Sequence, residues 1–173
     1  MDVVGANSSN TVTISGGGPM VDTIISLGQP AGCEVANTDY VTIKNLTIDN
    51  SNGSRGVWLW GDVDKLEIDN CYILGSTTTT SSADGGIVVS GQATTIYDYT
   101  ANVSNLTVSN CRIEGGYWGM VLQGRSTVQK NGPFIIENNE IVDAYGYGIR
   151  TYYVDGLELR ENTVPSMRST FAY

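Results

Sequence analysis

A short apolar pattern returns five times along this chain, and this repetition constrains the fold more than any other feature. The first copy reads Val41-x-Ile43-x-Asn45-Leu46-x-Ile48, and further copies begin at residues 66, 106, 134 and 157. The steps between copies are therefore 25, 40, 28 and 23 residues. Repeats of this period are typical of solenoids, in which each unit packs only against its neighbours.

Each copy contains a slip in its apolar alternation. Val41 and Ile43 alternate as one face of a strand does, but the next apolar residues are Leu46 and Ile48, which indicates a corner between two strands. A third apolar pair follows in four copies, always after a glycine, for which we expect a positive φ at a sharp turn into the strand. These motifs are Gly56-Val57-x-Leu59, Gly86-Ile87-x-Val89, Gly119-Met120-x-Leu122 and Gly148-Ile149-x-Thr151.

Three short strands per turn predict an all-β fold, a three-sided single-stranded parallel β-helix of about five to six coils. We expect one domain over residues 1–173, with regular coils over about 11–164 and an irregular tail at 165–173. An antiparallel sandwich would need hairpin turns between neighbouring strands. Asn-Gly and Asp-Gly pairs do occur, but at different offsets in the repeats, which favours the solenoid.

The Ile-x-Asn-x-x-Ile corner, followed by Gly-hydrophobic-x-hydrophobic, resembles right-handed parallel β-helix proteins of the pectate-lyase-like superfamily. The likeness covers about residues 11–164, and the wording of the repeats is similar to modules in large secreted bacterial surface proteins. The resemblance implies a right-handed coil, a longer parent chain and an extracellular or cell-surface location. The first residues, Met1-Asp2-Val3-Val4, do not read as a signal peptide, so we expect any such signal to lie outside this chain.

Charge and hydropathy narrow the possible partners. A formal charge of −9 and a pI near 4.2 argue against nucleic acid and anionic membranes, because both attract basic surfaces. No run of 18 apolar residues occurs, which argues against membrane insertion.

Three cysteines cannot form a closed disulfide set. Cys71 and Cys111 hold equivalent corners, where a disulfide and a ladder of small buried residues are both possible and the ladder is favoured, whereas Cys33 falls in an irregular first coil.

Asparagines recur at the same corner, and we predict a structural role for them. Stacked side-chain amides can donate and accept hydrogen bonds along the solenoid axis. The two sets are Asn45, Asn70, Asn110 and Asn138 at one offset, and Asn139 and Asn162 at the next.

The longest loops flank the face formed by the third strands. In the resembling family such a face forms a saccharide groove, so we expect a polysaccharide or surface glycan as ligand. Its outward positions are predicted to form two rows, Trp58, Val88, Val121 and Arg150, then Trp60, Ser90, Gln123 and Tyr152. Trp58 and Trp60 would supply a stacking platform, and Gln123, Arg150 and Tyr152 the polar contacts. Alternatively, the loop from Ser90 to Ser104 folds over the tryptophans. Trp118 and Tyr147 are predicted to stack on each other.

Catalytic chemistry is difficult to assemble on this face. The resembling lyases use a calcium-binding carboxylate cluster with a basic residue, and the hydrolases use clustered aspartates with Gly-His-Gly. This chain has no histidine and no Asp-Asp pair. We therefore expect a non-catalytic structural or adhesive module without a cofactor, although calcium at Asp62 and Asp64 stays open. A carbohydrate-active enzyme that uses the Trp58/Trp60 face is the alternative.

The ends of a parallel solenoid expose unpaired backbone groups that recruit further strands. Because neither end of this chain shows a capping helix, we expect additional coils or self-association through the terminal coils.

Overall fold

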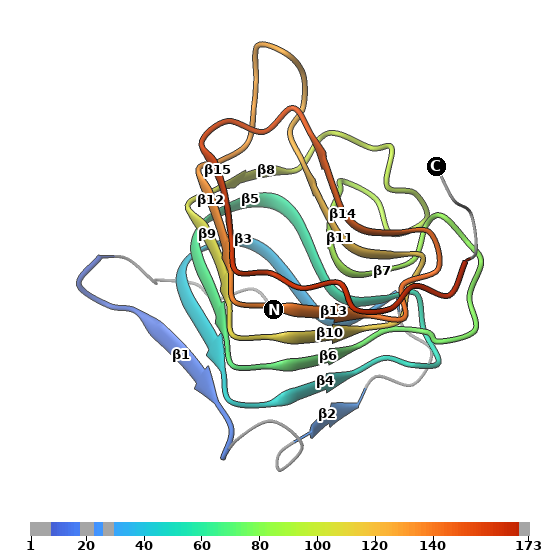
Figure 1. The fold of residues 1–173 in the computed structure, drawn as a ribbon. Helices are drawn as coiled ribbons and strands as arrows, with labels where there is room; N and C mark the ends of the chain where they lie inside the picture. The colour runs from blue at the N-terminus through green and yellow to red at the C-terminus, as the bar shows by residue number, and fades with distance from the viewer. Residues whose placement is uncertain (1–7, 18–22, 26–29, 170–173) are drawn as a thin grey trace.

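The computed structural model describes residues 8–17, 23–25 and 30–169, which coil into stacked parallel strands (Figure 1). The predicted all-β parallel solenoid is confirmed. Every pairing between the named strands is parallel. No helix long and apolar enough to cross a membrane occurs in the described residues.

Three faces surround the core. The first face stacks β1 (Val12–Ser15), the second half of β3 (Ala31–Lys44), the second half of β5 (Arg55–Asp69), β9 (Leu106–Ser109), β12 (Phe134–Glu137) and β15 (Leu157–Arg160). The second face stacks β2 (Thr23–Ile25), β4 (Thr47–Asp49), β6 (Tyr72–Leu74), β10 (Arg112–Glu114) and β13 (Glu140–Val142). The third face stacks the first halves of β3 and β5, then β7 (Gly85–Val89), β11 (Trp118–Gln123) and β14 (Tyr147–Tyr152).

The first and third faces are continuous at one corner. There β3 and β5 bend without interruption, so these faces merge into one ten-stranded sheet. A short strand that the sequence did not predict, β8 (Asn102–Ser104), lies in this corner and pairs with residues 62–64. Its inward residue Val103 is fully buried and extends the core into the corner.

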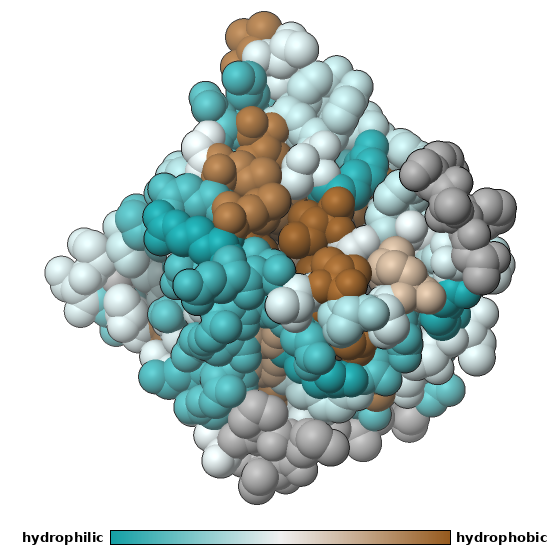
Figure 2. Space-filling model, viewed as in Figure 1, coloured by the Kyte–Doolittle hydropathy of each residue, from teal (hydrophilic) through white to brown (hydrophobic). Residues whose placement is uncertain are grey.

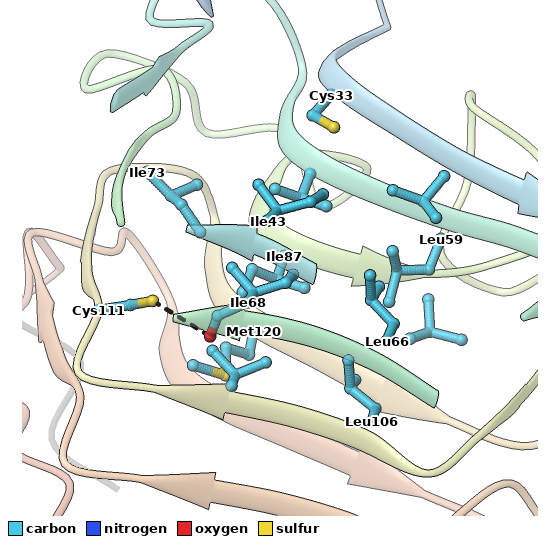
Figure 3. Close-up of a cluster of buried hydrophobic side chains, with 14 of the residues drawn as sticks. Cys33, Ile43, Leu59, Leu66, Ile68, Ile73, Ile87, Leu106, Cys111 and Met120 are labelled. Carbon is cyan, nitrogen blue, oxygen red and sulfur yellow. Dashed lines mark hydrogen bonds between the residues drawn. The ribbon is translucent and has the colours of Figure 1, made fainter. Parts of the chain in front are cut away.

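Equivalent residues of the repeats stack in register along the core. Ile43 pairs with Ile68, which pairs with Val108, and the same row continues to Ile136 and Leu159. Figure 3 shows part of this interior, to which Cys33 also belongs. The prediction that Cys33 lies in an irregular coil was wrong, because Cys33 pairs with Val57 and occupies a regular inward position of the third face. Burial raises the pKa of its thiol to about 11.

The corner between the first and second strands is made by residues in the left-handed region. Asn45, Asn70, Asn110, Asn138 and Glu161 have φ values between 48° and 57°. One such residue reverses which way the following side chains point, and this is the slip in the repeat. Asparagine tolerates this conformation better than most residues, which explains its recurrence.

The asparagines with positive φ also hydrogen-bond to one another along the solenoid axis, except at one step where an aspartate accepts the bond. Asn70 Nδ2 donates to Asn45 Oδ1 at 2.9 Å, and Asn138 Nδ2 donates to Asn110 Oδ1 at 2.5 Å. Asn110 Nδ2 instead donates to Asp69 Oδ1 at 2.7 Å, so a carboxylate carries the ladder across the longest repeat.

The next offset along the corner points inward and holds Leu46 in the first copy, then small or amide side chains in the later ones. Asn139 Nδ2 donates to Asn162 Oδ1 and to the Val108 carbonyl, each at 2.9 Å. In earlier coils this offset holds Cys71 and Cys111, which are buried free thiols rather than a disulfide. The Cys111 Sγ lies 3.6 Å from the Ile68 carbonyl oxygen, the contact drawn in Figure 3.

The glycines before the third strands do not have the positive φ that we expected. Gly56, Gly86, Gly119 and Gly148 have no φ in that region, so the expectation was wrong. Their role is close packing: a Cβ on Gly86 would lie 2.3 Å from Ile113 Cγ2 and 2.6 Å from the Gly119 carbonyl oxygen. The inward isoleucines of the second face occupy the space that a side chain would need.

The tail predicted to be irregular follows the second face as far as Ser169. Isolated parallel bridges join Glu140 to Thr163 and Ala144 to Met167. The Arg168 guanidinium donates to four backbone carbonyls, at Ser76, Thr77, Gly116 and Asp143. This side chain therefore fastens the tail to preceding coils.

Candidate ligand-binding surface

The third face has the register that the sequence predicts. Trp58 pairs with Val88, Val88 with Val121 and Val121 with Arg150, and Glu34 begins the row beside Trp58. In the second row Gln123 pairs with Tyr152. The candidate residues thus lie on one sheet surface, and the loops that cross it decide which of them reach solvent.

The loop between β7 and β8 covers the middle of this surface. It carries Ile96, which is buried in a small hydrophobic cluster outside the coil together with Val88, Trp118 and Val121. Trp58 is only 8% exposed, and its Nε1 donates to the Ser90 carbonyl at 2.7 Å. The expectation of an exposed Trp58 was therefore wrong, and the alternative of a covering loop describes this residue.

Trp60 and Gln123 are also engaged in internal contacts. Trp60 is half-buried, lies 5.7 Å from Trp58 between ring centroids, and donates to Glu34 Oε1 at 2.5 Å. Gln123 is 1% exposed, its amide donates to the Ile96 carbonyl, and its Oε1 accepts from Arg150 at 2.8 Å. Gln123 consequently orients Arg150 and is not itself available to a ligand in this structure.

Arg55 holds the covering loops and was missed by sequence reasoning. Its side chain is fully buried, with Nε donating to the Ala83 carbonyl at 3.2 Å, Nη1 to Ser90 Oγ at 2.9 Å and Nη2 to the Thr95 carbonyl at 3.0 Å. Burial lowers the pKa of Arg55 to about 10, and the nearby charge of Asp84 opposes this shift. A sequence signal for Arg55 was available. Arg55 directly precedes the recurring glycine, at the position that holds Trp118, a residue selected by the sequence, two coils later.

Arg150 lies at the uncovered end of the same surface, among aromatic rings. Its guanidinium carbon is 5.4 Å from the Tyr152 centroid, 5.6 Å from that of Tyr97 and 5.7 Å from that of Trp118. Trp118 and Tyr147 stack at 4.8 Å with 15° between their planes, as predicted. We name Tyr97, Trp118, Tyr147, Arg150 and Tyr152 the Arg150 patch.

The Arg150 patch is accessible and electrostatically unusual. Tyr97 is 57% exposed and Tyr152 is 43% exposed, whereas Trp118 is buried beneath them. None of the ion pairs between described residues includes Arg150. A cation among aromatic faces, without a carboxylate partner, offers both stacking and charged hydrogen bonding to a ligand. Tyr97 comes from the loop, which explains why spacing within the repeats did not select it.

Asp62 and Asp64, which were considered as calcium ligands, accept hydrogen bonds in the corner between the first and third faces. Asp64 accepts hydrogen bonds from Lys65, Ser104 and Asn105 at 2.6 to 2.7 Å, and Asp62 accepts one from Asn102 at 3.0 Å. Desolvation of Asp64 raises its pKa, but the three hydrogen bonds outweigh this effect and lower the pKa to about 2. The part of the chain that the structure describes contains no group of three or more His, Cys, Asp or Glu side chains placed to hold a metal ion.

Asp84, another acidic residue beside the third face, also takes part in internal hydrogen bonds. It is buried at the edge of the third face, and its Oδ2 accepts a hydrogen bond from Thr79 Oγ1 at 2.5 Å. Its backbone carbonyl accepts from the amides of Tyr117 and Trp118. Asp84 therefore secures the loop that precedes β7 to the following coil.

Comparison with known proteins agrees with this architecture. The family model described as a right handed beta helix region matches residues 4–171, nearly the whole chain. Searches of curated proteins and of solved structures found no match. The parallel stacking, the repeat register and the family match together show that this chain belongs to the right-handed β-helix family.

Proposed function

We propose that this chain is a non-catalytic β-helix module of a secreted or cell-surface protein, and that it binds a saccharide at the Arg150 patch. Family membership alone does not decide between binding and catalysis, because proteins with one fold host both. The observation that carries the proposal is the exposure of Tyr97 and Tyr152 around Arg150, which forms no ion pair with another described residue. Aromatic faces stack on the C–H faces of sugars, and a guanidinium donates to their oxygens.

Binding without turnover is supported by how the neighbouring polar groups are used. Arg55, Asp84 and Gln123 all lie on this face, but each is buried and hydrogen-bonded to a loop or to a neighbouring strand. General acid–base catalysis needs two groups that converge on one bond. A rigid sheet with an aromatic platform is better suited to adhesion.

A glycan array followed by calorimetry on the strongest hit tests the proposal. Tyr97→Ala and Tyr152→Ala should each weaken binding at least about tenfold, as loss of a stacking contact worth about 1.4 kcal/mol predicts. Val128→Ala is the matched control, because Val128 is 89% exposed on another loop. Binding that is the same in all three variants would contradict the proposal.

The enzyme alternative is tested separately by incubating the chain with polysaccharides in the presence of calcium. We expect no product release. Release that disappears in Arg150→Ala, but persists in Val128→Ala, would favour a carbohydrate-active enzyme over an adhesive module.

A further inference from the structure

The coil at the C-terminal end of the described residues exposes residues whose equivalents in the coil directly beneath it belong to the core. Leu159 is 51% exposed and Val164 is 44% exposed, although both occupy inward positions of the repeat. The residues directly below them in the register, Ile136 and Ile141, are fully buried. Figure 2 views this end and shows apolar side chains gathered at its centre. The core therefore continues to the surface at this end.

The backbone at this end is also unpaired among the described strands. β15 pairs with β12 on one side and ends the first face, and β14 ends the third face in the same way. An open strand edge beside an apolar surface is a template for another strand.

The opposite end of the same chain has the matching pattern. Among the described strands β1 pairs with β3 alone, and its inward residues Val12 and Ile14 are only partly buried. On the second face Ile24 stands in register with Ile48. One coil added beyond β15 would thus place Val12 and Ile14 over Leu157 and Leu159, and Ile24 over Val164.

Outward side chains at the two ends are compatible in this register. Thr13 of an added coil would lie beside Glu158, a combination that already occurs within the chain, where Thr42 Oγ1 donates to Glu67 Oε2 at 3.1 Å. Ser15 would lie beside Arg160, so no like charges meet.

We infer that this end surface binds a second copy of the chain head to tail, with β1 of the next copy parallel to β15. The contact uses the first and second faces, because the last coil has no described third strand. Such an interface joins two different surfaces and leaves both outer ends free, so association produces an open series and does not stop at the dimer. This inference is independent of saccharide binding.

Sedimentation velocity over a range of concentrations tests the inference with two variants. Leu159→Lys alters one surface and Ile14→Lys the other, and each alone should weaken association at least about tenfold, since it places a charge where a full apolar side chain would be buried. An equimolar mixture of the two variants retains one intact pair of surfaces. The mixture should therefore form dimers and no larger species, whereas the unmodified chain should form a series.

Matched measurements make each outcome decisive. Val128→Lys adds the same charge on an exposed loop and should associate like the unmodified chain. If Ile14→Lys loses its circular-dichroism melting transition, Ser15→Lys replaces it, because Ser15 is exposed and would face Arg160 of the other copy. An unmodified chain that stays monomeric at every concentration would overturn the inference. Self-association of Ile14→Lys alone that is as strong as that of the unmodified chain would also overturn it, because that result indicates a contact that does not use β1.

Discussion

Two arginines on one sheet surface have opposite surroundings. Arg55 and Arg150 both lie on the third face beside aromatic rings, Arg55 at 5.2 Å from Trp58 and Arg150 at 5.4 Å from Tyr152. Arg55 is fully buried and its three hydrogen bonds hold two loops, whereas Arg150 is half-buried and, among the described side chains, hydrogen-bonds to Gln123 alone. The comparison teaches that sheet register fixes which residues are neighbours, while the loops above the sheet decide whether those neighbours form core or surface.

The largest expected effect comes from removing the covered tryptophan. Trp58→Ala should lower the free energy of unfolding by about 3–4 kcal/mol, because a buried indole and its hydrogen bond to Ser90 are both lost. Tyr152→Ala, at the open end, should cost less than about 1 kcal/mol. Urea denaturation of both variants measures the difference. Equal losses would mean that the loop does not cover Trp58 in solution.

Replacing the two arginines tests the comparison directly. Arg55→Ala should destabilise by about 3 kcal/mol, because it leaves the buried Ser90 hydroxyl and two carbonyls without this donor. Arg150→Ala should change stability by less than about 1 kcal/mol and should weaken saccharide binding instead. Denaturation and calorimetry on both variants separate the two roles. A stable Arg55→Ala protein would remove the structural assignment of this side chain.

The glycine row gives the same contrast between an inner coil and the coil whose strand β14 ends the third face. Gly86→Ala should cost about 2 kcal/mol, since the new Cβ would lie 2.3 Å from Ile113 and 2.6 Å from a backbone oxygen. Gly148→Ala should cost less, because its nearest contact is Val164 Cγ2 at 3.0 Å and Val164 is free to shift at the exposed end. Thermal melting of the two variants measures both. The reverse order would contradict close packing as the role of this row.

The smallest expected effect is the pH dependence of stability that comes from Asp64, in the corner between the first and third faces. The pKa of Asp64 is about 2 in the folded chain and about 3.9 in an unfolded one. Its stabilising contribution is therefore present above pH 4 and is lost as the pH falls from about 4 towards 2. Asp64→Asn should cost about 1 kcal/mol at pH 7, after allowance for solvent screening, and almost nothing at pH 2. Urea midpoints at the two pH values measure this difference.

Much of the fold could be predicted from the repeats because stacking enforces register. Once the repeats were aligned, the neighbours within each row followed, including the outward row from Trp58 to Arg150. Predictions about conformation were less accurate. The positive φ belongs to the asparagine corners, while Gly86 is constrained by Ile113 of the following coil, and spacing alone does not distinguish these two reasons for a recurring residue.

The candidate site was predicted only in part. Arg150 and Tyr152 are accessible, but Trp58 and Gln123 are buried under a loop that also adds Tyr97 to the surface. Alternation shows whether a side chain points outward from the sheet. It does not show where the loop between Val89 and Asn102 folds, because that depends on contacts such as those of Arg55 and Ile96.

The sequence by itself determined the parallel solenoid, the register of its rows and the absence of histidine chemistry, because these depend on period and composition. Only the tertiary structure decided which aromatic residues reach solvent, which glycines are needed for space and how far the core is open at the last coil. The physical reason is the range of the interactions. Strand pairing repeats at a fixed step that sequence spacing records, whereas loop packing and burial arise between residues whose separation along the chain follows no period.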